Sequence, residues 1–294
     1  MKLGLESPHG EFGGDPTALR EYAKAVEELG YNHLSMYDHP VGVSPDDREV
    51  PLVYTEKDAF HDPLVAFAYL AGITERIEFV TGILVLPQRQ TVLVARQTAD
   101  LDLMSGGRLR LGVAPGYSPY EFEALEADFK TRGRRLDEQI PYLRRLWTEE
   151  LISFYGGFHR IDRAAIMPRP GRRIPIWVGG FSEPAYRRAV ALGDGFMFGR
   201  GLEGEAQRSW ERVQELLDQA GRPVDGFGAE FLLRPPEGSA YSDRELVDGL
   251  HRLRENGATH AAICPMGRGL ADASAHIAYA ESLSRLFERE GLWT

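Results

Sequence analysis

Short apolar runs alternate with longer amphipathic segments along the whole chain. In the first unit, the apolar run 3–7 is followed by Asp15 and Pro16, and then by apolar residues at helical spacing up to Gly30. Asp directly before Pro is typical of a helix start, and Gly is typical of a helix end. The pattern therefore predicts a strand followed by a helix.

The same alternation continues to the end of the sequence. Strands are predicted at 3–7, 31–37, 77–85, 108–114, 174–178, 195–198, 226–233 and 258–264. Helices are predicted near 16–29, 62–73, 89–104, 119–147, 183–193, 203–220, 243–256 and 272–290. Eight successive strand–helix units, with no hairpin between most of them, predict an α/β fold whose parallel sheet closes into a (β/α)8 TIM barrel.

A doubly wound open sheet is the alternative fold. Its usual signature is G-x-G-x-x-G directly after the first strand, whereas this chain has SPHGEFGG there, which disfavours a dinucleotide-binding fold. The chain has 294 residues, 43% of them hydrophobic, and no internal repeat. This length suits one barrel, so residues 1–294 are predicted to form a single domain.

Two predicted connections are long, at residues 38–61 and 148–173. Long loops on a barrel usually wall an active site, and we expect this of both. Pro141 lies within the predicted helix 119–147 and should kink or split it, because proline removes a backbone donor.

Composition narrows the class of protein. Acidic residues (44) outnumber basic residues (34), the net charge is −10, and no cluster of Lys and Arg suggests nucleic acid as a partner. The only cysteine, Cys264, excludes an intramolecular disulfide and is predicted to be buried in HAAICPM. No apolar stretch approaches the length of a membrane span or export signal, so no membrane contact and a cytoplasmic location are predicted.

In a barrel of this kind, the C-terminal ends of the strands build the active site. Those ends carry Glu6, Asp38, His39, Gly82, Ile83, Ala114, Pro115, Gly116, Tyr117, Gly179 and Gly180. His39 can gain or lose a proton near neutral pH, and the neighbouring Asp38 can hold its tautomer. The other interpretation of Asp38-His39 is a surface turn in which Asp caps the loop.

The segment WVGGFSEPAYRRAV joins a strand to a helix through Gly179 and Gly180, with Ser182 as the expected N-cap and Pro184 in the first turn. Bare backbone N–H groups at a helix start can bind an anion such as phosphate. The alternative is that these glycines only permit a tight turn, and LGVAPGYSPYEF leaves the same choice open.

A metal-dependent barrel hydrolase would also place Asp and His at strand ends. The eight histidines contain no H-x-H or H-E-x-x-H pair, so this class is disfavoured and no metal site is predicted.

Four segments resemble the luciferase-like monooxygenase superfamily, whose members use FMN or the deazaflavin coenzyme F420. They are MYDHP, FVTGILVLPQRQTVLVARQTADLDLMSGGRLRLGVAPGY, DFKTRGRRLDEQI and PIWVGGFSEPAYRRAVALGDGF, in this order. The resemblance is dense over residues 1–200 and thin beyond them.

The resemblance implies a barrel that holds a flavin or deazaflavin in its C-terminal mouth. It places Asp38 and His39 beside the ring edge and a cis peptide bond at Gly82-Ile83 behind the ring. The implied cofactor-binding residues are Asp38, Gly82, Ile83, Ala114, Pro115, Gly116, Tyr117, Gly179, Gly180 and Phe181, the last three at the phosphate. It also implies a homodimer and a small-molecule substrate.

Two departures from similar enzymes limit the substrate. F420-dependent glucose-6-phosphate dehydrogenases have an acidic glutamate where this chain has Tyr117, so that sugar-phosphate chemistry is not predicted. The segment RPPEGSAYSDRE is shorter than the lid-bearing insertion of bacterial luciferases, so light emission from a long aldehyde is not predicted.

Closeness to short deazaflavin enzymes favours F420 and hydride transfer, with an FMN-dependent monooxygenase using oxygen as the alternative. A non-catalytic flavin-binding protein is an alternative of another class. The predicted catalytic residues are His39 as proton donor or acceptor, Asp38 orienting it or its loop, and Tyr117 as a second hydrogen-bonding or acidic group. Aromatic residues that either line a pocket or pack in the core are Tyr54, Phe60, Phe198 and Trp210.

Overall fold

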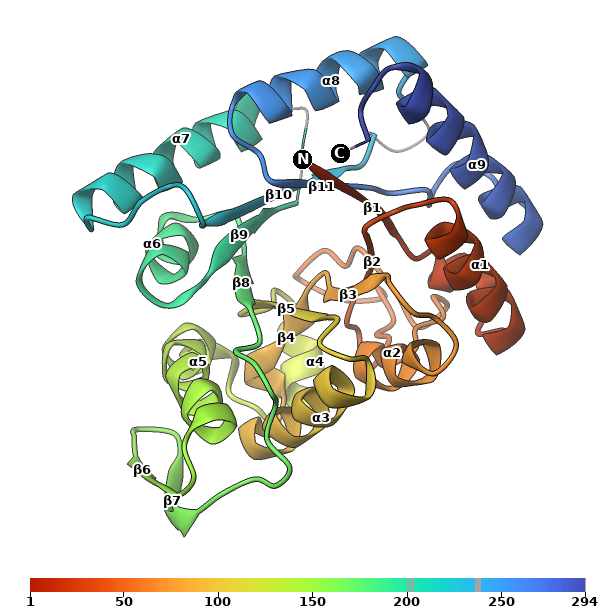
Figure 1. The fold of residues 1–294 in the computed structure, drawn as a ribbon. Coiled ribbons are helices and arrows are strands. Elements are labelled where there is room, and N and C mark those ends of the chain that lie inside the picture. Colours follow the sequence, from red (N-terminus) through yellow and green to blue (C-terminus); the bar gives the residue numbers. More distant parts are fainter. Residues whose placement is uncertain (200, 202–203, 236–238, 294) are drawn as a thin grey trace.

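The computed structural model describes residues 1–199, 201, 204–235 and 239–293. Its main sheet closes on itself (Figure 1). The strands follow one another around the ring as β1 (Lys2–Glu6), β2 (His33–Met36), β3 (Glu78–Thr81), β5 (Leu109–Ala114), β8 (Ile176–Gly179), β9 (Gly195–Phe198), β10 (Gly228–Leu233) and β11 (His260–Ile263). All these neighbours are parallel, and β11 pairs with β1. The predicted (β/α)8 barrel is confirmed, and the open sheet is wrong.

The third strand is interrupted. The predicted strand 77–85 consists of β3 and the short β4 (Leu84–Val85), which both pair with β5. Between them, the bond from Gly82 to Ile83 is a cis peptide, as the family resemblance implied. The interruption lies at the mouth of the barrel, next to the end of β2.

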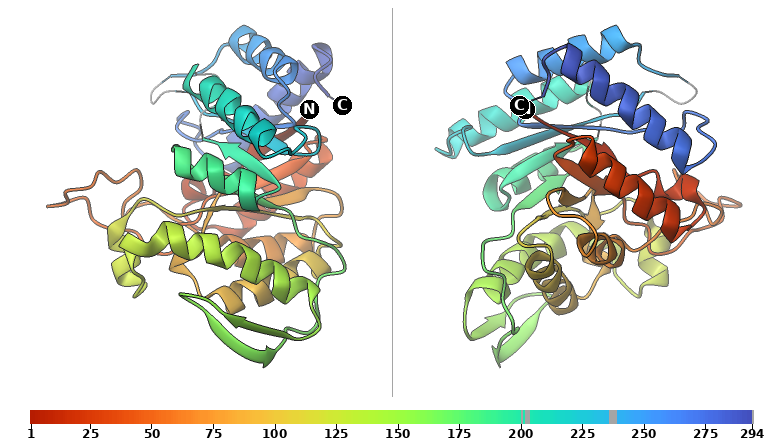
Figure 2. Two further views of the ribbon diagram at one scale, coloured as in Figure 1. Left: turned by 90° about the vertical axis from the view of Figure 1, so that its left-hand side faces the viewer. Right: turned by 45° about the vertical axis from the view of Figure 1, so that its right-hand side comes forward.

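Helices cover the outside of the barrel (Figure 2). They are α1 (Pro16–Glu28), α2 (Pro63–Ala71), α3 (Thr91–Met104), α5 (Arg132–Thr148), α6 (Glu183–Leu192), α7 (Gly204–Gln219), α8 (Asp243–Glu255) and α9 (Ala273–Arg289). The predicted start of α7 at 203 lies outside the described residues. Among the helices described, none has the length and apolar character that a membrane crossing requires.

The predicted helix 119–147 is divided, but not at Pro141. A short helix, α4 (Pro119–Ala124), is followed by a 3-10 turn, η3 (Phe129–Thr131), and then by α5, which runs through Pro141. Glu126 has a left-handed φ of 54°, which ends α4, and Asp128 accepts a hydrogen bond from the backbone of Lys130 at 2.9 Å. The split predicted at Pro141 is wrong, because α5 continues through this residue.

The two long connections lie at different ends of the barrel. Residues 148–173 follow helix α5, so they return to the start of a strand, and they contain the antiparallel hairpin of β6 (Ile152–Tyr155) and β7 (Arg160–Ala164). This hairpin lies outside α5 (Figure 1). Residues 38–61 follow strand β2 and project beside the mouth (Figure 2, left). The expectation that 148–173 walls the active site is wrong.

The interior of the barrel holds a buried charged layer. Arg110 of β5 pairs with Glu230 of β10 and, at 3.1 Å, with Glu78. Its guanidinium lies 4.2 Å from the ring centroid of Trp177. Trp177 lies flat across Gly228, where an added Cβ would come within 1.8 Å of the indole, so only glycine leaves room for this ring.

Candidate active site

The C-terminal ends of the strands surround a cavity of about 490 Å³, a size typical of small-molecule sites. The structure brings all the predicted strand-end residues to its wall: Glu6, Asp38, His39, Gly82, Ile83, Ala114, Pro115, Gly116, Tyr117, Gly179 and Gly180, with Phe181 beside them. The connection 38–61 adds Val53 and Tyr54. No residue of 148–173 is among the described residues of the wall.

The imidazole of His39 is held by Glu121 of α4. The two side chains are both largely buried, and Nδ1 of His39 lies 2.9 Å from Oε1 of Glu121. The other carboxylate oxygen accepts a hydrogen bond from Gln88 at 3.1 Å. Because a carboxylate accepts hydrogen bonds, Nδ1 of His39 is the donor in this contact, which leaves Nε2 as the ring nitrogen that can exchange a proton. His39 is therefore arranged as a proton acceptor at Nε2.

Glu121 was not among the predicted site residues. Its sequence context is S-x-x-E, and Ser118 does cap α4, accepting a hydrogen bond from the Glu121 backbone at 3.4 Å. In that motif the glutamate normally folds back onto the cap. Here its side chain crosses to His39 instead, 82 positions away in the chain. The S-x-x-E motif marks Glu121 in the sequence, but it predicts a residue that caps its own helix and not a partner of His39.

Asp38 holds the loop rather than the imidazole. Its carboxylate accepts hydrogen bonds from Arg89 at 2.6 Å and from the backbone N–H of Val85 at 2.9 Å. Burial raises the pKa of Asp38, and the guanidinium of Arg89 opposes that shift. Arg89 also binds Asp62, whose side chain caps α2. Asp38 therefore connects the end of β2 to β4 and to the start of α2.

Tyr117 lies at the rim of the cavity and is 40% exposed. Its ring centroid is 6.3 Å from that of His39, and its hydroxyl accepts a hydrogen bond from the backbone of Val53 at 3.3 Å. Burial raises the pKa of Tyr117 above its ordinary value. At neutral pH this phenol can donate a hydrogen bond but is a poor acid.

The glycine segment before α6 forms one side of the mouth. Gly180 has φ 147°, and an added Cβ would lie 2.7 Å from Ala185. Ser182 occupies the N-cap position, but its side chain makes no capping hydrogen bond. Arg132 lines the same cavity and donates to the backbone oxygen of Gly116 at 3.2 Å. Arg132, which was not among the predicted site residues, adds a guanidinium to the cavity in which the anion site was predicted.

The opposite side of the mouth carries a second guanidinium, Arg234, just after β10. Its Nε lies 3.4 Å from Sγ of Cys264. Cys264 is buried, as predicted, and burial raises the pKa of this thiol to about 12. A thiol with so high a pKa is not a nucleophile near neutral pH.

The aromatic candidates divide between the two interpretations. Tyr54 and Phe198 line the cavity, and the ring of Phe60 lies 5.0 Å from that of His39. Trp210 belongs to α7 and is buried, and its indole donates to the backbone oxygen of Asn256 at 2.7 Å. Trp210 is a core residue.

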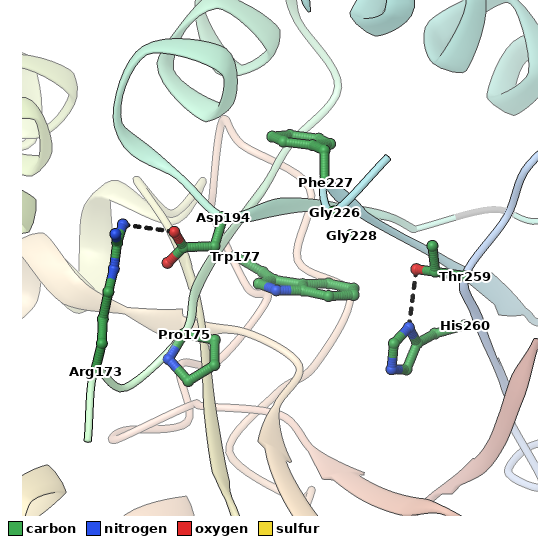
Figure 3. Close-up of a pocket in the computed structure, with 9 residues that line it drawn as sticks. All are labelled: Arg173, Pro175, Trp177, Asp194, Gly226, Phe227, Gly228, Thr259 and His260. Carbon is green, nitrogen blue, oxygen red and sulfur yellow. Dashed lines mark hydrogen bonds and ion pairs between the residues drawn. The ribbon is translucent and has the colours of Figure 1, made fainter. Parts of the chain in front are cut away.

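A second cavity of about 400 Å³ lies at the other end of the barrel (Figure 3). Its lining residues stand at or before the starts of β8, β9, β10 and β11. Arg173 pairs with Asp194 at 2.6 Å, and Nδ1 of His260 lies 2.9 Å from the Thr259 hydroxyl. In the part of the chain that the structure describes, no three His, Cys, Asp or Glu side chains are grouped to hold a metal ion.

Comparison with known proteins identifies the class. The family described as luciferase-like monooxygenase matches residues 2–289, nearly the whole chain. This chain belongs to that family and is accordingly an oxidoreductase.

Individual relatives agree with this assignment. An uncharacterised protein of Mycobacterium tuberculosis is 33% identical over 243 residues, which cover 81% of each chain. An F420-dependent glucose-6-phosphate dehydrogenase of Intrasporangium calvum is 30% identical over 265 residues, covering 86% of this chain and 73% of that enzyme.

Solved structures share the fold. A monooxygenase from Streptomyces bottropensis superposes with a TM-score of 0.77 at 20% identity, covering 99% of both chains. An F420-dependent secondary alcohol dehydrogenase in complex with an F420-acetone adduct gives a TM-score of 0.78 at 15% identity, covering 97% of this chain and 98% of that one.

Proposed function

We propose that this protein is a coenzyme F420-dependent oxidoreductase that interconverts an alcohol and a carbonyl compound in the mouth cavity. The observation that carries the proposal is His39, fixed by Glu121 at Nδ1 and placed on the wall of that cavity. The 30% identity to an enzyme named as F420-dependent supports this cofactor over FMN.

The residues present fit a flat ring with an anionic tail. Ile83, Val85 and Ala114 give the cavity an apolar wall. At Gly116 an added Cβ would lie 2.5 Å from Val85, so the backbone there stays bare. The segment 179–182 and Arg132 would hold the phosphate at the other end. When bound, F420 accepts or supplies a hydride, and the protein contributes binding and orientation.

His39 performs the proton transfer in this proposal. Oxidation of an alcohol removes a hydride from its carbon and a proton from its oxygen, and Nε2 of His39 takes that proton. Glu121 then stabilises the imidazolium that forms. In the reverse direction the same nitrogen returns the proton to the carbonyl oxygen. Tyr117 provides a hydrogen-bond donor at the rim, and Asp38 fixes the loop that carries His39.

Equilibrium binding of F420 and of FMN to the purified protein, measured side by side by absorbance and fluorescence, tests the cofactor. We expect F420 to bind more tightly than FMN. Addition of a secondary alcohol should then reduce F420 and abolish its visible absorbance. Arg132→Met should weaken F420 binding by roughly 10- to 100-fold. Arg160→Met is the matched control, because Arg160 also stacks on an aromatic ring but lies on the β6–β7 hairpin.

Tighter binding of FMN, with substrate-dependent oxygen consumption, would replace this proposal by an FMN-dependent monooxygenase. Binding of either cofactor without any turnover across a panel of alcohols, carbonyl compounds and oxygen would favour a non-catalytic flavin-binding protein.

We also propose that the protein is a cytoplasmic homodimer that pairs through α2 and α3. Helix α2 has no charged residue, yet Val65 is 66% exposed, and Met104 at the end of α3 is 73% exposed. Exposed apolar faces of this kind mark protein contacts. Sedimentation should give twice the chain mass, and Val65→Glu should produce monomers. A monomeric unmodified protein would contradict the proposal.

The cytoplasmic location is supported by the single cysteine, whose thiol is free.

A further inference from the structure

Arg234 lies on the cavity wall, and its hydrogen bonds to described residues go to neutral groups. Its Nη2 donates to the hydroxyls of Tyr37 and Tyr54, the latter at 3.0 Å, and its Nε approaches Cys264. The guanidinium also lies 5.1 Å from the centroid of the Tyr37 ring. Burial raises the pKa of both tyrosines, so their hydroxyls stay neutral at physiological pH.

Among the residues that the structure describes, little negative charge compensates that of Arg234. The carboxylate of Glu6 is its one ion-pair partner among the residues described, at 3.7 Å, which is long for a charge-assisted hydrogen bond. Burial raises the pKa of Glu6, and Arg234, Cys264 and Tyr37 oppose that shift. Arg234 itself remains 34% exposed toward the cavity, and no described residue accepts a hydrogen bond from its Nη1.

A guanidinium with unused donors is costly unless a ligand completes it. A ligand carboxylate suits Arg234. It can accept two hydrogen bonds from the planar guanidinium, and the hydroxyls of Tyr37 and Tyr54 hold that guanidinium in place. A phosphate dianion suits the same place less well, because the carboxyl group of Glu6 lies beside Arg234 and repels a second negative charge more strongly.

The position of Arg234 relative to His39 indicates how far the carboxylate of the substrate lies from its reacting carbon. Tyr54 lies between the two groups, with its ring centroid 4.9 Å from that of His39 and its hydroxyl bonded to Arg234. The proton-transfer site and Arg234 are therefore separated by about one tyrosine side chain. A molecule that reaches both would carry its carboxylate a few bonds away from the reacting carbon.

We propose that Arg234, held in place by Tyr37 and Tyr54, anchors the carboxylate of a hydroxy acid or oxo acid whose alcohol or carbonyl group reacts at His39. The location of the reacting group rests on the proposed function. The anchor itself is a binding site, and its occupation can be measured without the cofactor.

The test uses the oxo acid levulinate, its uncharged methyl ester and inorganic phosphate as probes in calorimetric titrations. The unmodified protein should bind levulinate at least tenfold more tightly than the ester. Arg234→Met should weaken levulinate binding by roughly 10- to 100-fold and leave ester binding unchanged. Arg268→Met is the matched control, because Arg268 also stacks on a tyrosine, Tyr279, but does not line the cavity. It should bind all three probes like the unmodified protein.

Two further variants keep the test decisive. If Arg234→Met does not fold, Arg234→Lys takes its place in the test. This variant keeps the positive charge but lacks the planar guanidinium, so it should lose part of the levulinate affinity. Glu6→Gln should keep or improve levulinate affinity, because it removes a competing carboxylate. Equal binding of acid and ester, a tenfold loss in Glu6→Gln, or phosphate binding more tightly than levulinate would overturn the proposal.

The outcomes also separate the two proposals. Levulinate binding that depends on Arg234 in a protein that does not bind F420 would support the anchor and contradict the proposed function. Reduction of neutral ketones with F420, unaffected by Arg234→Met and not improved by a carboxylate, would support the function and contradict the anchor.

Discussion

The two ends of the barrel have cavities of similar size, about 490 Å³ at the C-terminal mouth and about 400 Å³ at the other end. Both contain arginine, histidine and aromatic side chains. At the N-terminal end, the charged group of Arg173 is paired with Asp194, and the imidazole of His260 meets Thr259 (Figure 3). At the mouth, the hydrogen bonds that Arg132 and Arg234 make to described residues end on neutral groups, and His39 is held through one ring nitrogen by Glu121.

The difference shows that arginine charges without a carboxylate hydrogen-bonded to them, and not the volume of the cavity, distinguish the mouth. The mouth receives the long connection 38–61 and the bare backbone of Gly179 and Gly180, whereas the other end is formed by the starts of strands. A second His–Glu pair, outside the mouth, has both of its ring nitrogens occupied. His159 contacts Glu138 at 2.8 Å, but its Nε2 lies 2.7 Å from the Thr91 hydroxyl.

The largest effect should come from replacing the imidazole at the mouth. His39→Gln removes the proton acceptor and should lower kcat by about 10²- to 10⁴-fold, with F420 affinity within about tenfold of the unmodified protein. His159→Gln, in the matched pair outside the cavity, should leave kcat unchanged. Steady-state rates with F420 measure both. Full activity of His39→Gln would remove this residue from the mechanism.

The charged layer between the cavities should dominate stability. Burial opposes ionisation of Glu230, but Arg110 and His33 outweigh it and hold the pKa of Glu230 well below its usual range. Its stabilising contribution is therefore present above about pH 4.5 and is lost as pH falls through the lower folded-state pKa. Arg110→Met leaves Glu230 buried without its partner and should cost about 3–5 kcal/mol in unfolding free energy.

Urea denaturation across pH would measure this effect. Glu78, His33 and His260 also face the pair, so Glu230→Gln is the informative companion and should show a weaker loss of stability on acidification. Equal acid sensitivity of Glu230→Gln and the unmodified protein would contradict the assignment.

A smaller effect is expected from the partner of His39. Glu121→Gln keeps a hydrogen-bonding group but removes the charge that stabilises the imidazolium, so kcat should fall about 10- to 100-fold while KM changes little. Glu121→Asp should restore part of the rate. Glu138→Gln is the control in the other His–Glu pair and should not affect kcat. A change confined to KM would indicate a role in substrate binding instead.

The smallest effect is expected at the N-terminal cavity. Arg173→Met removes an exposed ion pair with Asp194, which also contacts Arg144, so the unfolding free energy should change by about 0.5 kcal/mol or less. Turnover and cofactor binding should be unchanged. A clear loss of turnover in a stably folded variant would show that this end of the barrel takes part in function and would break the comparison.

The fold was predictable because its signals are local and repeated. Alternating strand and helix patterns specify the barrel, and barrel geometry then places Glu6, His39 and Gly180 at one rim. The length of segment 148–173 suggested a role at that rim, but its place after a helix puts it at the other end. Length alone does not indicate which end of a barrel a loop joins.

The partners of the site residues were harder to predict. Glu121 reaches His39 across 82 positions and Arg234 reaches Tyr54 across 180, and such contacts leave no periodic pattern in a sequence. The sequence around Arg132 and Arg234 does not by itself mark them as site residues. The chemistry of these residues depends on which strand end or helix start each one follows, and this becomes apparent only once the barrel is closed.

At the rim of the mouth cavity, the connection 38–61 is hydrogen-bonded to the stretch that carries Glu121. The hydroxyl of Tyr117 holds Val53, and that of Tyr120 accepts hydrogen bonds from the backbone of Glu49 and Val50. Both tyrosines belong to the five-residue stretch that ends in Glu121. These hydrogen bonds tie residues 49–53 of the connection 38–61 to the stretch that carries Glu121, so a displacement of that connection would also shift the carboxylate that holds His39.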